Sequence, residues 1–465
     1  MKNLASFKRL ITLAMASVNV LYEWLWYRYF WYGELFPRWV KERLPFFENG
    51  HILVLVIYAA LLFMCASMYG GMKLSYYRNT EVIFSMIFAT LFTNVLTYAQ
   101  TSLMCLRLLP VYMFLKMTVL QILGVIVWTV VAQWILGKIF APRKLLLIHG
   151  NRPIEDILRK FSSRKDKYSI RKCVACRAEN PDNRKELEAE INGEYDGVVL
   201  WDIPAEERNY YLKYCYGRGI RVYTMPKITD VILKGSEQLH LFDTPILLNR
   251  EYSLTVEQRF IKRTIDLICS LLLFIVTSPI MLITAVIIKC YDGGPVLYKQ
   301  TRCTLNQKEF QILKFRSMRV DAEKDGVARL AAKQDSRITP VGRFIRKVRI
   351  DELPQLLNII RGEMSFIGPR PERPEIIEKY LEVMPEFAFR TKVKAGLAGY
   401  AQVYGKYNTT PYDKLKLDLF YIENYSIWLD IKLMLLTLKI LFTPDSTEGV
   451  DLEQITAMKN EGNNE

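Results

Sequence analysis

Two adjacent carboxylates, Asp351 and Glu352, lie within a run of cationic residues in this chain of 465 residues. Four cationic residues of the run Arg343–Arg349 precede the pair, and Arg370 follows it between two prolines. Magnesium prefers hard oxygen ligands such as carboxylates, and arginine neutralises charge that develops on a transferred phosphoryl group. An aspartate kept ionised by a helix N-terminus and neighbouring arginines can also attack phosphorus, which gives an acyl phosphate. These residue types therefore predict phosphoryl transfer.

A structural interpretation of Asp351 competes with the catalytic one. Pro354 suits the first turn of a helix, and apolar residues follow at helical spacing: Leu353, Leu356, Leu357 and Ile360. Asp351 would then be a helix N-cap, and the arginines would form a solvated face. The sequence Pro369-Arg370-Pro371 favours the catalytic interpretation, because two prolines pre-set the backbone of Arg370 and suit a guanidinium fixed toward a phosphate.

Ser278 and Pro279 interrupt an apolar run, Leu267 to Ile288, that contains no charged residue. As a straight helix this run would measure roughly 33 Å, about one hydrocarbon thickness. Basic residues flank it on both sides, and basic flanks favour the cytoplasmic face. A helix that enters the membrane, kinks at Ser278-Pro279 and leaves on the same face satisfies both flanks, with the serine hydroxyl bonding a carbonyl freed by proline. The alternative is a kinked fifth span.

The first part of the chain predicts a block of four membrane spans. Three apolar segments have the length that a bilayer requires, Ile52–Tyr69, Val82–Leu106 and Met117–Gly137. Leu10–Tyr27 is interrupted by Glu23, but its tryptophans and tyrosine suit a membrane interface, so we count it as a span. Basic residues at the N-terminus, between the second and third spans, and after the fourth predict that these ends are cytoplasmic.

Residues 144–224 change to short apolar segments separated by polar helical stretches. The predicted strands are Leu145–Ile148, Ile170–Ala175, Gly197–Trp201 and Ile220–Tyr223. This alternation indicates a small parallel sheet of Rossmann-like type. A dinucleotide fold would carry several glycines after its first strand, whereas this chain has only Gly150 there, which favours a structural or regulatory module over a nucleotide-binding one.

Composition limits the function classes. Hydrophobic residues make up 51% of the chain, which points to a membrane protein, and the formal net charge of +15 fits anionic partners. The basic residues lack interleaved aromatic platforms, which argues against nucleic-acid binding. The eight cysteines form no dense framework, which indicates a reducing compartment. The single CxxC, Cys173 to Cys176, is interpreted as part of a strand, with zinc or redox chemistry as the alternative.

Residues 255–445 resemble the monotopic polyprenyl-phosphate sugar-1-phosphate transferases, the bacterial sugar transferase family. Several motifs occur in the order typical of that family: Ser278-Pro279, Lys299-Gln300, Lys314-Phe315-Arg316-Ser317-Met318, Asp351-Glu352-Leu353-Pro354-Gln355-Leu356 and Pro369-Arg370-Pro371. The spans and the Rossmann-like module ahead of them resemble the larger members of the family, which use hexose-1-phosphate and are often homodimeric. Cys303-Thr304, Ala398 and Tyr400 depart from the residues frequent in the family.

The resemblance implies a two-step reaction and assigns roles to the residues. A UDP-sugar would give its sugar phosphate to Asp351 with release of UMP, and undecaprenyl phosphate would then collect it, as the first membrane step of exopolysaccharide, capsule or O-antigen synthesis. Glu352 would hold magnesium with Asp351 or position the reacting groups. The implied phosphate contacts are Arg346, Arg370, Lys299, Lys314 and Arg316. Ser278 and Pro279 would shape the re-entrant helix and have no catalytic role.

These expectations give three domains in a multi-pass protein of the bacterial inner membrane. Residues 1–140 would form four transmembrane helices, residues 141–250 a Rossmann-like cytoplasmic module, and residues 251–465 the re-entrant helix with a mostly helical catalytic domain on the cytoplasmic side. Membrane lipids are expected partners of the apolar segments. A non-enzymic sensor or scaffold that binds a ligand through the Rossmann-like module is the second functional hypothesis.

Overall fold

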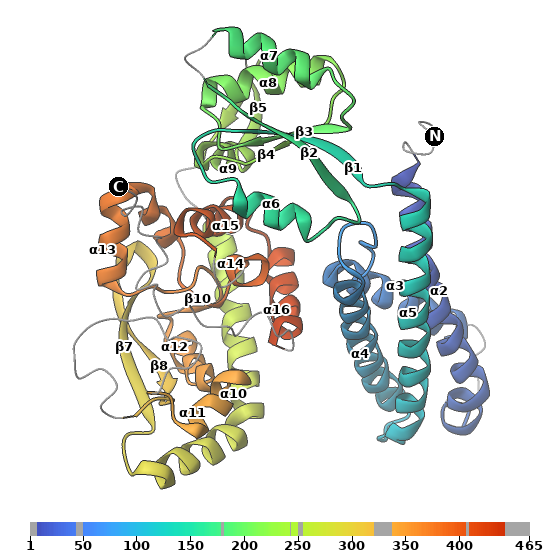
Figure 1. Cartoon of the computed structure of the whole chain (residues 1–465). Coiled ribbons are helices and arrows are strands. Elements are labelled where there is room, and N and C mark those ends of the chain that lie inside the picture. Colours follow the sequence, from blue (N-terminus) through green and yellow to red (C-terminus); the bar gives the residue numbers. More distant parts are fainter. Residues whose placement is uncertain are drawn as a thin grey trace. The chain divides into compact units, whose positions relative to one another are not determined.

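A computed structural model describes residues 7–42, 50–177, 181–241, 243–249, 254–319, 337–405 and 409–441 (Figure 1). The chain divides into two compact units, Met1–Pro226 and Lys227–Glu465. Each unit is described by itself below. The elements of the first unit are α2 (Lys8–Phe30), the π-helical η1 (Trp31–Val40), α3 (Gly50–Tyr69), α4 (Asn79–Met104), α5 (Val111–Ile139), β1 (Arg143–His149), α6 (Glu155–Ser162), β2 (Tyr168–Ala175), α7 (Pro181–Ile191), β3 (Gly197–Trp201), α8 (Ala205–Gly217) and β4 (Val222–Thr224).

The second unit contains one long helix and many short elements. They are α9 (Ile228–Lys234), β5 (Glu237–Leu241), β6 (Thr244–Leu248), α10 (Val256–Asp292), β7 (Leu297–Cys303), η2 (Leu305–Gln307), β8 (Glu309–Phe315), α11 (Pro340–Lys347), η3 (Ile350–Glu352), α12 (Gln355–Arg361), β9 (Ser365–Ile367), α13 (Pro374–Val383), η4 (Pro385–Lys392), β10 (Gly396–Ala398), α14 (Tyr400–Tyr404), α15 (Pro411–Glu423) and α16 (Ile427–Leu441).

Four helices of the described chain are long and apolar enough to cross a membrane, namely α3, α4, α5 and α10. The three internal spans predicted for the first block are thus present as apolar helices. The segment predicted as the first span is also helical, as α2, and packs against α3 and α5. It is less apolar than the other four because Asn19, Glu23 and several tyrosines and tryptophans interrupt its hydrophobic residues.

Polar side chains join the helices of this first block from inside. The Thr90 hydroxyl donates to Glu23 Oε2 at 2.8 Å, and Gln121 Nε2 donates to the Tyr58 hydroxyl at 2.8 Å. The Tyr58 hydroxyl in turn donates to Asn94 Oδ1 at 3.0 Å. Polar groups in an apolar surrounding are stable only when they pair with one another. These hydrogen bonds connect α2, α3, α4 and α5 and fix how the four helices pack.

The sheet of the first unit confirms the predicted parallel arrangement. Its strands run in the order β2-β1-β3-β4, and every neighbouring pair is parallel. Alternate residues of β1 face opposite sides: Leu146 and Ile148 pack toward α7 and α8, whereas Leu145 and Leu147 pack toward α6. Figure 1 shows α6 on the opposite side of the sheet from α7 and α8. The CxxC motif begins on the edge strand β2, where Cys173 is exposed. The order resembles flavodoxin-like doubly wound sheets more than the 3-2-1-4 order of dinucleotide-binding folds.

Close chain packing explains the single glycine after β1. A Cβ atom at Gly150 would lie 2.2 Å from the carbonyl oxygen of Asp202, and the Gly150 amide donates to the carbonyl of Trp201 at 3.0 Å. The backbone after β3 therefore lies where a doubly wound sheet would hold a ligand, beside the carboxyl ends of β1 and β3. This packing favours the structural interpretation of the module over nucleotide binding.

The basic ends of the helical block lie on the side of the sheet module. Arg164, in the loop before β2, donates to the carbonyl of Tyr76 between α3 and α4 at 2.5 Å, and Arg78 donates to the carbonyl of Ser163 at 3.1 Å. Lys8, at the start of α2, lies 4.6 Å from the ring centre of Phe140, which follows α5. The structure thus brings together the three basic segments that the sequence assigns to one side of the membrane.

In the second unit, α10 is continuous over 37 residues and bends (Figure 1). Pro279 lies inside it and cannot donate to the carbonyl of Ile275, which would be its partner in a regular helix. The Ser278 hydroxyl donates to this carbonyl oxygen at 2.8 Å, as the sequence predicts. Most apolar side chains of α10 in this region are exposed, as lipid-facing residues would be: Leu271, Leu272, Ile275, Val276, Ile280, Leu282 and Ile283.

Three charged residues near the start of α10 attach it to the rest of the unit. Arg263 donates to the carbonyls of Ile359 and Ile360, at the end of α12, at 2.6 and 2.8 Å. Asp266 Oδ1 accepts from the backbone amide of Phe366 in β9 at 2.9 Å. Lys262 forms a buried ion pair of 2.7 Å with an aspartate of α16, Asp430. The apolar helix and the segment that follows Asp351 are therefore held in one arrangement.

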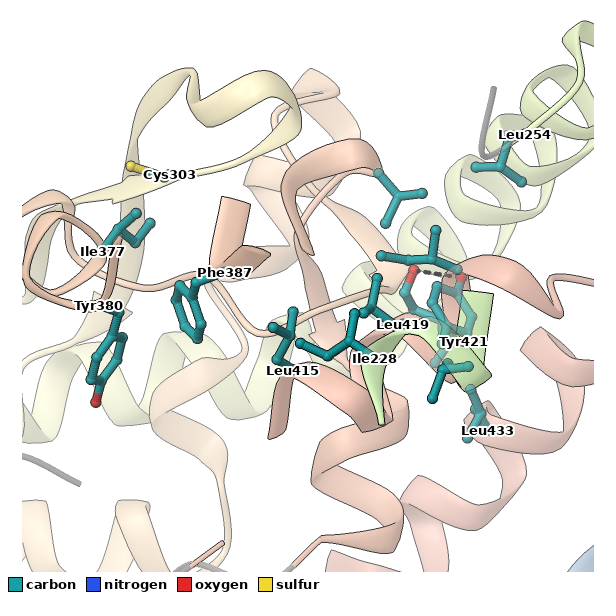
Figure 2. Packing of buried hydrophobic residues seen from close by; sticks show 14 of the residues in the cluster. Ile228, Leu254, Cys303, Ile377, Tyr380, Phe387, Leu415, Leu419, Tyr421 and Leu433 are labelled. Atoms are coloured by element: carbon teal, nitrogen blue, oxygen red, sulfur yellow. Dashed lines mark hydrogen bonds between the residues drawn. The ribbon is translucent and has the colours of Figure 1, made fainter. Parts of the chain in front are cut away.

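The main apolar core of this unit includes residues that we had assigned to the sheet module. Ile228 and Val231 of α9 lie in the same buried cluster as Leu415 and Leu419 of α15 (Figure 2). Tyr421 belongs to this cluster, and its hydroxyl donates to the carbonyl of Ile367 in β9 at 3.2 Å. Residues after Pro226 thus pack with the second unit, so the compact boundary precedes the predicted domain boundary at residue 250.

Candidate active site

The carboxylate pair lies in η3, directly before α12, and α12 is fixed to the hairpin β7–β8. Asn358 of α12 is fully buried; its Oδ1 accepts from the amide of Leu313 at 3.0 Å, and its Nδ2 donates to the carbonyl of Gln311 at 2.8 Å. The Asn358 side chain thereby makes the backbone hydrogen bonds that a neighbouring strand would make with β8. The Leu356 and Ile359 side chains pack against the same hairpin. This packing sets the position of η3 relative to β8.

Three cations lie close to Glu352: Lys314 from β8, Arg349 directly before η3, and Arg370 from the loop after β9. The Glu352 Oε1 atom lies 2.9 Å from Nη2 of Arg370, 3.5 Å from Nζ of Lys314 and 3.6 Å from Nη1 of Arg349. Burial alone would raise the pKa of Glu352, but Arg370, Lys314 and Arg349 hold it far below its ordinary value. Burial also lowers the pKa of Lys314 to about 8, although Glu352 opposes this shift. Glu352 is therefore an ionised anchor for these cations.

Asp351 has a different environment from its neighbour. Its side chain is buried, and its Oδ1 has no hydrogen-bond partner among the described residues. Burial and the charge of Glu352 raise the pKa of Asp351 to about 6, against the opposing influence of Lys314, Arg346 and Arg349. Asp351 does not cap α12, because the residue before that helix is Pro354 and no side chain caps it. The N-cap interpretation is therefore wrong, and Asp351 Oδ1 is a buried carboxylate oxygen without a hydrogen-bond partner in the described part of the chain.

Arg349 is a site residue that sequence reasoning did not single out. Its backbone adopts the left-handed conformation, with φ of 58°, directly before η3. Few non-glycine residues adopt this conformation, and it is costly enough that such residues concentrate at functional sites. The turn brings Arg349 back toward Glu352, three residues later. The cluster of arginines before the carboxylates was the available sequence signal, but it did not indicate which of them would turn inward.

A second charge network fixes the backbone of Arg370 and was also missed. Arg390 Nη2 donates to the carbonyl of Arg370 at 2.9 Å, and Arg302 Nη1 donates to the carbonyl of Pro371 at 3.1 Å. Glu372 lies 3.7 Å from Arg302 and 3.6 Å from Arg390. Burial opposes ionisation of Glu372, but Lys414, Arg390 and Arg302 hold its pKa below the ordinary value. Arg370 is thus fixed by neighbouring charges as well as by its two prolines.

Only some of the other predicted phosphate contacts lie near the carboxylate pair. Lys314 faces Glu352, whereas Lys299 pairs with Leu313 across the hairpin and therefore points to the opposite face, where it is exposed. Arg316 is buried and pairs through Nη2 with Asp292 at the end of α10, while its Nη1 has no partner in the described part of the chain. Arg346 is half-buried and lowers the pKa of Asp351. The structure therefore brings Lys314, Arg346 and Arg370 to the carboxylate pair.

The residues at the site fit a magnesium ion that would be shared with substrate phosphates. Within the described ranges, no group of three or more histidine, cysteine or acidic side chains is placed so that it could hold a metal ion by itself. Asp351 supplies one unpartnered oxygen, and Glu352 is already paired with cations. Magnesium is commonly bound through one or two carboxylates together with substrate phosphates and water. The donor set fits that mode of binding, with Asp351 as the protein ligand.

Comparison with known proteins identifies the family of this chain. A family model described as bacterial sugar transferase matches residues 257–444. The chain is 40% identical over 190 residues to a UDP-glucose:undecaprenyl-phosphate glucose-1-phosphate transferase of Caulobacter vibrioides, covering 40% of this chain and 71% of that protein. The chain belongs to the bacterial sugar transferase family. The matched residues contain α10 except its first residue, the hairpin β7–β8 and the Asp351–Glu352 pair.

Longer members of the bacterial sugar transferase family match a larger part of this chain. An undecaprenyl-phosphate glucose phosphotransferase of Komagataeibacter xylinus is 42% identical over 263 residues, which is 52% of this chain and 48% of that protein. A UDP-N-acetylgalactosamine-undecaprenyl-phosphate N-acetylgalactosaminephosphotransferase of Aeromonas hydrophila is 36% identical over 258 residues, 54% of this chain and 59% of that protein. The chain spans about half the length of these two relatives.

Proposed function

We propose that this protein transfers a sugar-1-phosphate from a UDP-sugar to undecaprenyl phosphate and releases UMP. The observation that carries the proposal is the buried, unpartnered oxygen of Asp351 beside cations that Glu352 holds in place. Family membership and the printed names of the relatives support a hexose or N-acetylhexosamine phosphate as the transferred group. Such a step would begin the assembly of an exopolysaccharide, capsule or O-antigen on its lipid carrier.

The proposed reaction has two displacement steps at one phosphorus atom. Asp351 attacks the phosphorus that bears the sugar, the bond to the bridging oxygen breaks, and UMP leaves with the electron pair. An oxygen of undecaprenyl phosphate then attacks the same phosphorus, and Asp351 is released as a carboxylate. Arg346 and Lys314 stabilise negative charge on the phosphoryl group, and Arg370 is held toward it by Glu352. Bound magnesium would supply further neutralisation of the diphosphate.

Purified protein tests the activity directly. Incubation with magnesium, undecaprenyl phosphate and a panel of UDP-glucose, UDP-galactose and UDP-N-acetylated hexoses should release UMP with at least one sugar. Release of UDP in place of UMP would mean ordinary glycosyl transfer and would contradict the proposal. The second functional hypothesis, a non-enzymic sensor, has weaker support because the backbone after β3 occupies the ligand position of the sheet module.

The pKa of Asp351 predicts how the first step depends on pH. Only the ionised carboxylate attacks, so the rate of UMP release should fall as pH decreases through about 6. Burial and, after it, the charge of Glu352 raise this pKa, and Glu352→Gln removes the second cause, so the acid limb of the profile should move to lower pH in that variant. The measurement is a single turnover with UDP-sugar and no lipid, because lipid phosphate titrates in the same range. A profile without an acid limb, or a limb unmoved by Glu352→Gln, would contradict this assignment.

We further propose that α10 enters the membrane and returns to the same face, with Pro279 at the bend. The support is the bend itself, the serine hydrogen bond that satisfies the freed carbonyl, and the basic residues on both flanks. Both flanks, and the catalytic residues after them, would then face the cytoplasm, where nucleotide sugars occur. An ordinary fifth span would instead place the two flanks of α10 in opposite compartments.

Cysteine labelling distinguishes the two topologies. Val256 at the start of α10 is exposed, and Cys290 near its end is an exposed free cysteine. In a background with the other cysteines replaced by serine, we expect Val256→Cys and Cys290 to react with an impermeant maleimide from the same side. Intact cells and inverted membrane vesicles report the two sides separately. Labelling of the two positions from opposite sides would overturn the re-entrant proposal.

A homodimer and a cytoplasmic sheet module are further parts of the proposal. They are supported by the resemblance to the larger family members and by the basic segments gathered beside the sheet. Mass measurement of the detergent-solubilised protein checks the first, and the labelling scheme applied to the exposed Cys173 checks the second.

A further inference from the structure

Gln355, the first residue of α12, is a buried polar residue that the proposed reaction has not yet used. Its side chain is 2% exposed, and its Nε2 has no hydrogen-bond partner in the described part of the chain. A buried donor without a partner is costly, and folded proteins keep few of them. Such a group marks a place where a ligand is expected to accept the missing hydrogen bond.

Asn358, the next side-chain amide of α12, has a structural role and serves as a comparison for Gln355. Asn358 is also fully buried, but both ends of its side chain are paired, with Leu313, Gln311 and Glu363. The fold therefore satisfies a buried amide where that amide holds elements together. Gln355 has no comparable contact through its Nε2, although it lies only one turn earlier in α12.

Gln355 lies one helical turn after Asp351. Leu353 and Pro354 between them have helical backbone angles, φ −56°, ψ −36° and φ −60°, ψ −18°, so the helical path continues from η3 into α12. Residues four apart on such a path share one face. The Asp351 Oδ1 acceptor and the Gln355 Nε2 donor are thus both buried, both unpartnered and on the same face. They are not bonded to each other, so each keeps its capacity to pair with a bound group.

We propose that Gln355 Nε2 donates a hydrogen bond to a non-bridging oxygen of the phosphoryl group that Asp351 accepts. The inference rests on the proposed function and adds a catalytic residue to it. Arg370, Arg349 and Lys314 are paired with Glu352. An uncharged donor next to Asp351 adds a hydrogen bond to the phosphoryl group without forming an ion pair with the Asp351 carboxylate. The oxygen carries negative charge in both displacement steps, while Gln355 transfers no proton.

The test compares Gln355→Leu with Asn358→Leu. For Gln355→Leu we expect UMP release in a single turnover to slow by about 100-fold, as when one oxyanion donor is removed. Its thermal unfolding temperature should stay the same or rise, because the variant removes an unpartnered buried donor. Asn358→Leu breaks satisfied hydrogen bonds and should lower the unfolding temperature. Transfer from preformed enzyme intermediate to undecaprenyl phosphate should also slow in Gln355→Leu.

Two results would overturn the inference alone. The first is an active wild type together with a Gln355→Leu variant whose rates in both half-reactions stay within about threefold of the wild-type rates. Loss of one oxyanion donor should instead slow the reaction by about 100-fold. The second is a loss of rate in Gln355→Leu accompanied by the lowered unfolding temperature expected for Asn358→Leu, which would make its role structural. A wild-type protein that releases no UMP from any UDP-sugar would overturn the proposed function and this inference together.

Discussion

Asp351→Asn should abolish UMP release and leave no covalent sugar phosphate on the protein. The amide is too weak a nucleophile to attack phosphorus, and the remaining cations can bind the substrate without completing the transfer. Intact-protein mass spectrometry after incubation with UDP-sugar alone should show the added mass on the wild type and not on the variant. Glu375→Gln, at an exposed acidic position of α13, serves as the control and should retain the added mass.

The same substitution should stabilise the fold at neutral pH. The pKa of Asp351 is raised from 3.8 to about 6 in the folded protein, so folding favours the protonated form. The stability that this preference contributes is present below about pH 4 and is lost as pH rises through 6, which amounts to up to about 3 kcal/mol. Asp351→Asn removes this dependence. Its unfolding temperature should therefore exceed that of the wild type at pH 8 and approach it below pH 5.

A variant that still forms the intermediate, or one that is less stable at pH 8, would contradict these expectations in different ways. The first result would remove Asp351 as the nucleophile. The second would mean that its carboxylate is stabilised by groups that the geometry around Oδ1 does not provide. A loss of activity combined with a gain in stability is the pattern that distinguishes a catalytic carboxylate from a structural one.

Arg370→Gln should reduce the rate of UMP release by about 100- to 1,000-fold, the range seen when a charge-stabilising donor is removed. The Arg370 guanidinium lies 2.9 Å from Glu352 Oε1. Its removal leaves this buried carboxylate with two cations, Lys314 at 3.5 Å and Arg349 at 3.6 Å. Lysine keeps the charge but not the planar fork, so Arg370→Lys should recover only part of the activity. Steady-state and single-turnover rates at saturating UDP-sugar measure the effect.

Arg361→Gln is the matched control for this arginine. Arg361 ends α12 on the same segment of chain but is exposed. Its replacement should leave the rate within about twofold, because exposed charges contribute little to stability or geometry. Equal losses in both variants would indicate a general effect of positive charge on substrate attraction, and the specific role of Arg370 would then be wrong.

Several features follow from the sequence because they depend on local physical chemistry. Apolar segments of sufficient length form helices in a membrane, because their backbone groups must pair within the segment, so α3, α4, α5 and α10 could be predicted. The alternation of apolar and polar segments gave the parallel sheet. Ser278 next to Pro279 predicted the hydrogen bond to Ile275, because a proline at a given position frees one particular carbonyl.

Other local features were only partly predictable. The apolar face expected for the helix after Pro354 was Leu353, Leu356, Leu357 and Ile360, whereas the structure buries Leu356 and Ile359 most completely. The reason is that α12 is covered on two sides, by α10 and by β8, so one amphipathic stripe does not describe it. The boundary between the compact units falls after Pro226, before the predicted boundary at residue 250, because α9 packs on α15, which lies far along the chain.

The carboxylate pair, its proline-framed arginine and the membrane helices were determined by the sequence alone, since residue type and short spacing specify them. Only the tertiary structure decided which carboxylate is free. Asp351 and Glu352 are neighbours with the same chemistry, and they differ because Lys314 of β8, Arg349 and Arg370 converge on Glu352. The inward turn of Arg349 and the unpartnered amide of Gln355 likewise depend on contacts between segments distant in sequence. Such contacts set the electric field at each group, and that field distinguishes Asp351, the proposed nucleophile, from Glu352, which pairs with the cations.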